Sequence, residues 1–190
     1  MEPVNTRDPA AAARAYLALE WSLALGHRYR PKQGCTCGRS TTCAIPGAHP
    51  VLGADRLDEA SVSEALESSP GAGLIAWTER FDAVLVPRQI GMAAMVLLDR
   101  KRPVTCLIPD PDTYALLVMP STGRYAAVDP AVMVCTGEDG WIALPPSRGV
   151  RWDTPPWIEG TAEPRGLIHG DEIRHALADC FTVVKTGAAR

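Results

Sequence analysis

The chain has 190 residues, of which 46% are hydrophobic and 22% are charged. This length suits one domain with a sizeable core, and this composition argues against wholesale disorder. The formal net charge of -3 excludes a protein that holds nucleic acid by its overall positive charge. Any contact with nucleic acid therefore needs a local basic patch.

Neither a membrane span nor a secretory signal is evident in the sequence. No apolar run reaches the roughly 18 residues typical of a span, and the N-terminus lacks the basic, apolar and small-residue order of a signal peptide. We therefore expect a cytoplasmic protein with no membrane partner. Thiols stay reduced in that compartment, so clustered cysteines are expected to bind metal rather than to form disulfides.

The first third of the chain predicts two helices. Residues 10–25 are strong helix formers between a capping Asp8 with Pro9 and a terminating Gly26. A second helix is expected over 61–68, where a serine and a glutamate three residues apart are spaced as a capping box.

The middle of the chain changes to short apolar runs that are typical of strands. We expect residues 74–77 and 81–86 to form a hairpin around 78–80, followed by a helix over 91–98. Four further apolar runs bounded by Pro, Gly or Asp are expected to be strands: 104–108, 114–119, 131–135 and 141–144.

The end of the chain predicts a loop and a closing helix. Residues 145–166 are rich in Pro, Arg, Trp and Gly, and residues 171–181 favour helix. The whole pattern predicts one α+β domain over 1–182, in which a mixed sheet is flanked by helices. Residues 183–190 are expected to form a flexible tail.

Residues 34–50 contain a dense set of metal-ligating side chains. Three thiols and one imidazole come from Cys35, Cys37, Cys43 and His49. Four such ligands are the usual tetrahedral set of a structural zinc site, so we expect zinc here, with a metal-free loop as the alternative. A catalytic zinc is disfavoured because no ligand position is left open for water.

Three later segments form a further pattern. Residues 81–84 are an apolar strand with an acid, residues 117–124 are a strand that runs into a Ser/Gly turn, and residues 137–147 are a Gly turn followed by a strand and Pro-Pro-Ser. An N-terminal helix and a Cys/His loop ending in Pro-Gly-x-His-Pro precede these segments. With its segments in this order, the chain resembles the bifunctional DNA primase/polymerase domain of the archaeo-eukaryotic primase superfamily. Actinobacterial and mobile-element members are the most similar. The resemblance covers residues 10–180, and its most specific pieces are 35–50 and 140–152.

The resemblance implies a nucleotidyltransferase site in which three acids hold two magnesium or manganese ions and a histidine contacts the nucleotide. Asp82 can serve as one acid of the first strand. However, Val84 stands where its partner belongs, Arg124 stands where the histidine is expected, and residues 132–135 contain no acid. One carboxylate cannot hold two such ions. The residues therefore predict a catalytically degenerate domain, and whether it is an enzyme stays open.

Asp82 also has a simpler interpretation as a strand-edge acid paired with Arg80 or Arg88, which we favour. A metal role for it would need a second acid. Three acids lie in nearby turns and are the candidates: Asp129, Glu138 and Asp139.

Several polar and basic residues are candidates for nucleotide or nucleic-acid binding. Ser121, Gly123 and Arg124 can cradle a phosphate as a turn of backbone donors. Basic and aromatic side chains on the late loop suit single-stranded nucleic acid, although the same residue types also cover ordinary protein surfaces. The late-loop candidates are Ser147, Arg148 and Trp152.

The sequence thus predicts a primase/polymerase-like domain with structural zinc that acts as a nucleic-acid or nucleotide-binding accessory in DNA replication or its regulation. DNA or nucleotide and a replication or regulatory protein are the expected partners. Two alternatives remain at this point. One is an active template-dependent DNA primase/polymerase that uses magnesium or manganese. The other is a non-enzymatic protein-interaction module on the same scaffold.

Overall fold

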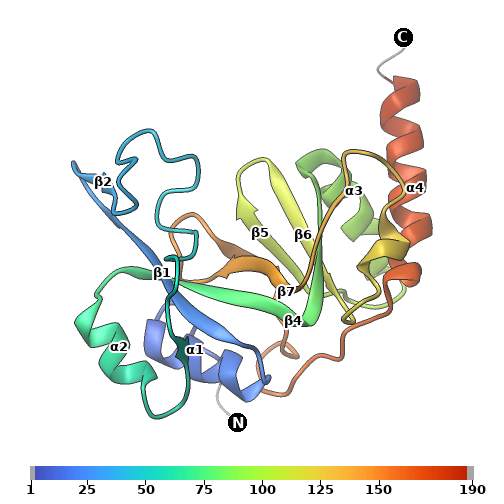
Figure 1. Cartoon of the computed structure of the whole chain (residues 1–190). Helices are drawn as coiled ribbons and strands as arrows, with labels where there is room; N and C mark the ends of the chain where they lie inside the picture. Colours follow the sequence, from blue (N-terminus) through green and yellow to red (C-terminus); the bar gives the residue numbers. More distant parts are fainter. Residues whose placement is uncertain (1–2, 188–190) are drawn as a thin grey trace.

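An antiparallel sheet forms the middle of the molecule, with α1 and α2 at one end and α3 and α4 at the other (Figure 1). The computed structural model describes residues 3–187. The helices are α1 (Pro9–Ala18), α2 (Val62–Ser68), α3 (Arg88–Asp99), the 3-10 helix η1 (Gly123–Ala126) and α4 (Gly170–Gly187). The strands are β1 (Leu23–Arg30), β2 (Gly34–Cys35), β3 (Arg56–Leu57), β4 (Ala72–Pro87), β5 (Cys106–Asp110), β6 (Thr113–Val118), β7 (Met133–Leu144) and β8 (Arg151–Thr154). The α+β class is confirmed.

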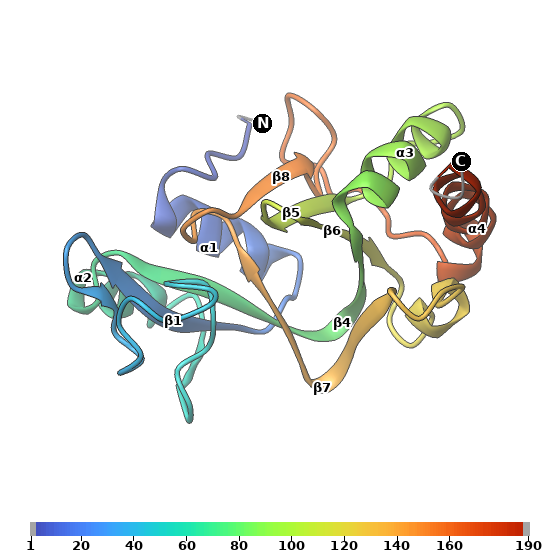
Figure 2. The same ribbon diagram turned by 90° about the horizontal axis from the view of Figure 1, so that it is seen from above.

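The sheet is built around the long strand β4, which pairs with β1, β6 and β7. Every pair of named strands is antiparallel, so the expectation of a mixed sheet was wrong for these strands. The predicted hairpin around 78–80 was also wrong. Those residues continue β4, because β7 pairs with both of its halves, and β4 and β7 bend together at their middles (Figure 2). Residues 133–135 and 141–144 accordingly belong to one strand rather than two, and 131–132 precede it.

Helix α1 begins as predicted but ends earlier. Asp8 Oδ1 accepts hydrogen bonds from the backbone N–H groups of Ala10 and Ala11, at 2.9 and 3.1 Å. The helix ends at Ala18 rather than at residue 25, and Glu20 takes a left-handed φ of 60°. Residues 23–25 leave the helix because they pair with β4, and these tertiary contacts override their helix propensity.

The later helices and the strands β5 and β6 were predicted in the correct type with less accurate bounds, whereas the predicted loop and tail each contain regular structure. α2 and α3 are present, although Ser61 makes no side-chain cap bond to α2. The predicted loop over 145–166 contains the short strand β8, which pairs with β5. The closing helix α4 extends through 183–187, which was expected to be tail, and residues 188–190 lie outside the described part of the chain.

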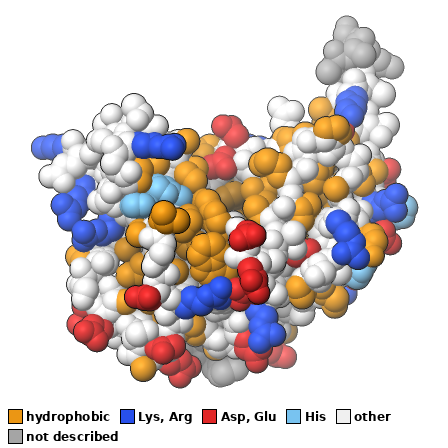
Figure 3. Space-filling view, in the orientation of Figure 1, with side chains coloured by type: hydrophobic (Ala, Val, Ile, Leu, Met, Phe, Trp, Pro, Cys, Tyr) orange, Lys and Arg blue, Asp and Glu red, His pale blue; other side chains and the backbone are white. Residues whose placement is uncertain are grey.

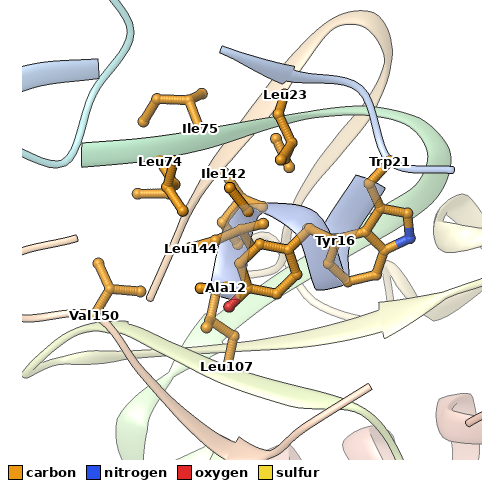
Figure 4. Packing of buried hydrophobic residues seen from close by; sticks show 14 of the residues in the cluster. Ala12, Tyr16, Trp21, Leu23, Leu74, Ile75, Leu107, Ile142, Leu144 and Val150 are labelled. Atoms are coloured by element: carbon orange, nitrogen blue, oxygen red, sulfur yellow. The ribbon is translucent and has the colours of Figure 1, made fainter. Parts of the chain in front are cut away.

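Two apolar cores lie on opposite sides of the sheet. The α1 core contains Tyr16 and Trp21, whose rings stack at 5.7 Å between centroids (Figure 4). The α3/α4 core contains Ile90 from α3 and Ile173 from α4. From Phe81 to Val86, the side chains of β4 alternate between the two sides of the sheet, as expected for a strand that is covered on both faces. This alternation decides which β4 residues can face a site.

Candidate metal centre and basic surface

The four predicted metal ligands converge at the end of β1. The ligand atoms of Cys35, Cys37, Cys43 and His49 all lie within 4.8 Å of one another. His49 Nε2 is 3.3 Å from Cys35 Sγ and 3.4 Å from Cys43 Sγ. These separations suit a tetrahedral ion bound at about 2.0 Å by nitrogen and about 2.3 Å by sulfur. The predicted ligand set therefore fits a bound metal.

The fold holds this loop against the sheet at both of its ends. At the first end, Cys35 pairs with Tyr29 across the β1–β2 ribbon. At the other end, the backbone N–H of His27 donates to the backbone oxygen of His49 at 2.9 Å. Gly34 has a φ of +82°, and a Cβ there would lie 2.5 Å from the carbonyl carbon of Ser40. Glycine is thus required at this turn.

Backbone donors favour the thiolate form of two of the cysteines. Burial alone would raise the pKa of Cys35, but the N–H groups of Gly47 and Cys37 hold it below its ordinary value. The N–H of Arg39 lowers the pKa of Cys37. Burial raises the pKa of Cys43. Since the thiolate is the form that binds metal, the loop backbone assists ligation at Cys35 and Cys37.

Asp82 is buried on the side of β4 that carries the α3/α4 core, with 1% of its surface exposed. Its Oδ2 accepts a hydrogen bond from the Gly123 N–H at 2.7 Å, and its Oδ1 accepts one from the Thr136 hydroxyl at 2.6 Å. The predicted ion pair with an arginine was therefore wrong. Arg80 instead pairs with Glu20, and Arg88 donates to the backbone oxygen of Pro111. Asp82 joins β4 to η1 and β7.

The other candidate acids do not gather around Asp82. Asp129 accepts a hydrogen bond from Lys185 at 2.5 Å and another from the Ala131 N–H. Glu138 and Asp139 are exposed at the bend of β7. Within the described residues 3–187, the cysteine–histidine centre is the one group of three or more such ligands close enough to share an ion.

The predicted phosphate cradle is only partly open. The Gly123 N–H points inward and donates to Asp82, so it is not free to bind a phosphate. Ser121 is exposed with a left-handed φ of 64°. The guanidinium of Arg124 lies 4.7 Å from the ring centroid of Tyr125. Ser121 and Arg124 remain accessible, but the central backbone donor is already used.

Two of the three late-loop candidates belong to the interior framework. The Ser147 hydroxyl accepts a hydrogen bond from the Leu74 N–H and donates one to the Leu74 oxygen, at 2.8 and 3.1 Å. Trp152 donates from Nε1 to the Tyr16 hydroxyl at 3.0 Å and packs in the α1 core. Sequence reasoning missed these roles because both partners are distant along the chain.

Arg148 is the late-loop residue that reaches the metal centre. Its guanidinium carbon lies 3.3 Å from the ring centroid of Tyr29, a cation–π contact. A Cβ on Gly47 would lie 3.1 Å from Tyr29 and 3.7 Å from Arg148, so the metal loop passes beside this pair. The structure thus joins two basic segments that are far apart in the sequence.

Positive charge gathers around the metal centre and the β1–β2 ribbon. Residues 21–54 contain no Asp or Glu and four cations. Because the whole chain carries -3 and this segment +4, the remaining residues together carry -7. In Figure 3 several blue side chains lie around the pale-blue histidines on the left, whereas the blue side chains at the lower centre and right lie beside acidic groups. We define the basic surface as these residues: Arg28, Arg30, Lys32, Arg39 and Arg148.

A cavity of about 290 Å³ lies between the metal loop, the end of β5 and β7. Its lining is mostly apolar and includes Ile45, Leu85 and Trp141, with Asp110 and Asp139 as its acids. Leu85 faces it because alternate residues of β4 point to opposite sides, which directs Asp82 away. In the second half of β4, an acid pair that faced this cavity would need odd-numbered positions, and these hold Phe81, Ala83 and Leu85.

Comparison with protein-family models, with curated proteins and with solved structures gives no match. Among the described residues, no helix is long and apolar enough to cross a membrane.

Proposed function

We propose that this protein is a zinc-stabilised domain that binds single-stranded nucleic acid. It would act as an accessory in DNA replication or its regulation, as a primase-polymerase-like domain without nucleotidyl transfer. The observation that carries the proposal is the basic surface, in which Arg148 lies over Tyr29 beside the metal loop. The chain is acidic overall, so residues 21–54, with four cations and no acid, form a local concentration of positive charge.

The donor set supports zinc as the metal. Three thiolates and one imidazole are soft or borderline ligands in a closed site, and this combination selects zinc over magnesium, calcium or manganese. Three thiolates with Zn²⁺ carry a net charge of -1. The four cations of residues 21–54 exceed it, so the surface stays positive when the metal is bound.

The chemistry of the basic surface suits phosphate and base together. Lysine and arginine neutralise phosphates and release counterions, which favours any nucleic acid. One face of the Arg148 guanidinium is covered by Tyr29, while its exposed outer side can contact a phosphate or stack on an unpaired base. Planar groups presented in this way favour single strands, whose bases are accessible.

The environment of Asp82 supports the absence of nucleotidyl transfer. Both of its oxygens are engaged in hydrogen bonds inside the fold. The nearby cavity has a mostly apolar lining with two acids, whereas two divalent ions need several oxygen ligands.

Binding to a fluorescein-labelled oligo(dT) measured by anisotropy tests this proposal. We expect binding that weakens steeply as salt rises. Arg148→Ala should weaken it by about tenfold, which corresponds to about 1.4 kcal/mol. Arg174→Ala is the matched control, since Arg174 is an exposed arginine of α4 that pairs with Asp171, and it should bind as the wild type does. Salt-independent binding, or equal effects of the two substitutions, would contradict the proposed surface.

A primer-extension assay tests the enzymatic alternative. With primed and unprimed templates and with magnesium or manganese, we expect no incorporation of nucleotides, because the side chains for a two-metal site are not assembled. Incorporation that disappears in Asp139→Asn or Asp110→Asn would instead place catalysis in the cavity that these two acids line. That outcome would overturn the non-catalytic part of the proposal.

A further inference from the structure

Helix α3 has an apolar outer face. Its inner face packs in the α3/α4 core through Ile90, Ala94, Met95 and Leu98. A helix at the surface of a globular protein normally carries polar residues on the opposite side. On α3 the middle of the exposed side is apolar instead. Met92 is 47% exposed, Val96 is 58% exposed and Leu97 is 37% exposed, and the exposed Ala93 lies beside them.

Within residues 3–187, no other element covers this face. α3 lies at the edge of the molecule, with β4, β6 and α4 on its inner side (Figures 1 and 2). The stretch 89–98 contains no charged residue, so the central part of the helix has no polar group that would need solvent except Gln89. A contiguous exposed apolar patch with charges at its ends is typical of an interaction site.

The charges at the two ends of α3 are complementary to a second copy of the same helix. Arg88 and Asp99 are the first and last residues of α3 and are both exposed. They are about three helical turns apart, so they lie on the same flank of the helix. In an antiparallel pair related by a two-fold axis, Arg88 of each copy faces Asp99 of the other. On the other flank of the helix, Gln89 of each copy faces Arg100 of the other in the same way.

The apolar residues fit the same register. Met92 and Val96 are one turn apart and lie on either side of the helix midpoint. In the antiparallel arrangement Met92 of one copy therefore packs on Val96 of the other. We propose that α3 is a homodimerisation helix, through which two copies of this chain associate in an antiparallel, two-fold symmetric pair. This proposal does not depend on nucleic-acid binding.

Sedimentation equilibrium on the full chain tests the proposal. A single helix pair is at the small end of interface sizes, so we expect a dimer with a micromolar dissociation constant. Val96→Glu puts two carboxylates at the centre of the interface and should raise that constant on the order of 100-fold. Val183→Glu is the matched control, since Val183 is a 69% exposed valine of α4, and it should leave the dimer unchanged.

A charge exchange tests the register. Arg88→Glu and Asp99→Arg should each weaken the dimer, and the double variant should restore it. Circular dichroism of each variant checks that the fold is kept. A wild type that stays monomeric up to its solubility limit would overturn the proposal and leave the face to a different protein. A dimer that survives Val96→Glu would also overturn it, because the contact would then lie elsewhere.

Discussion

Removal of the metal with a chelator is expected to unfold residues 34–50 and to lower the thermal midpoint of the whole protein by about 10 °C. The loop has little regular structure, and its three thiols and one imidazole lie within 4.8 Å of one another, so we expect a bound ion to hold them together. Its end is nevertheless part of the fold, because Ala48 is 7% exposed and lies in the α1 core. Loss of the metal therefore removes contacts of the core as well as the loop.

Single cysteine substitutions separate ligation from general destabilisation. Cys37→Ser should abolish tight metal binding and reproduce the effect of the chelator. Cys135→Ser is the control, because Cys135 is a half-buried thiol of β7 outside the cluster, and it should retain one metal ion per chain. Native mass spectrometry gives both the stoichiometry and the identity of the metal. A protein purified without metal that melts at the same temperature with and without added zinc would rule out a structural centre.

The parts of the fold that could be predicted are those with local signals. Asp8 and Pro9 define the start of α1 without reference to the rest of the chain. The end of α1 could not be predicted in the same way. Residues 23–25 have good helix propensity, and only their pairing with β4 shows that they are a strand. The continuity of β4 through 78–80 likewise depends on β7, which lies far along the chain.

The candidate site follows the same division. All four candidate metal ligands come from one short loop, so their spacing was sufficient to predict that they could share an ion. The contact between Arg148 and Tyr29 joins distant segments, and no spacing rule indicates it. The sequence also did not indicate that Ser147 and Trp152 lie in the interior. Both have side chains typical of a binding loop, but their hydrogen bonds to Leu74 and Tyr16 place them in the interior framework.

Asp82→Ala is expected to lower the free energy of unfolding by about 3 kcal/mol, because it removes two hydrogen bonds to a buried carboxylate. The Gly123 N–H is buried and would be left without its acceptor. The Thr136 hydroxyl would also lose its partner. The three segments that Asp82 joins are β4, η1 and β7, so the loss is structural and should appear in urea denaturation as a lower midpoint with an unchanged slope.

Asp82→Asn distinguishes this structural role from a metal role. The asparagine oxygen can still accept from the Gly123 N–H, and its amide can donate to the Thr136 hydroxyl, so most of the stability should be kept. A ligand of a catalytic ion behaves differently, because a neutral amide cannot replace the charge of a carboxylate. The asparagine variant should therefore be nearly as stable as the wild type and bind oligo(dT) equally well. If it is stable but loses a metal-dependent incorporation that the wild type possesses, Asp82 is a catalytic ligand and the hydrogen bonds described here belong to a resting state of an enzyme.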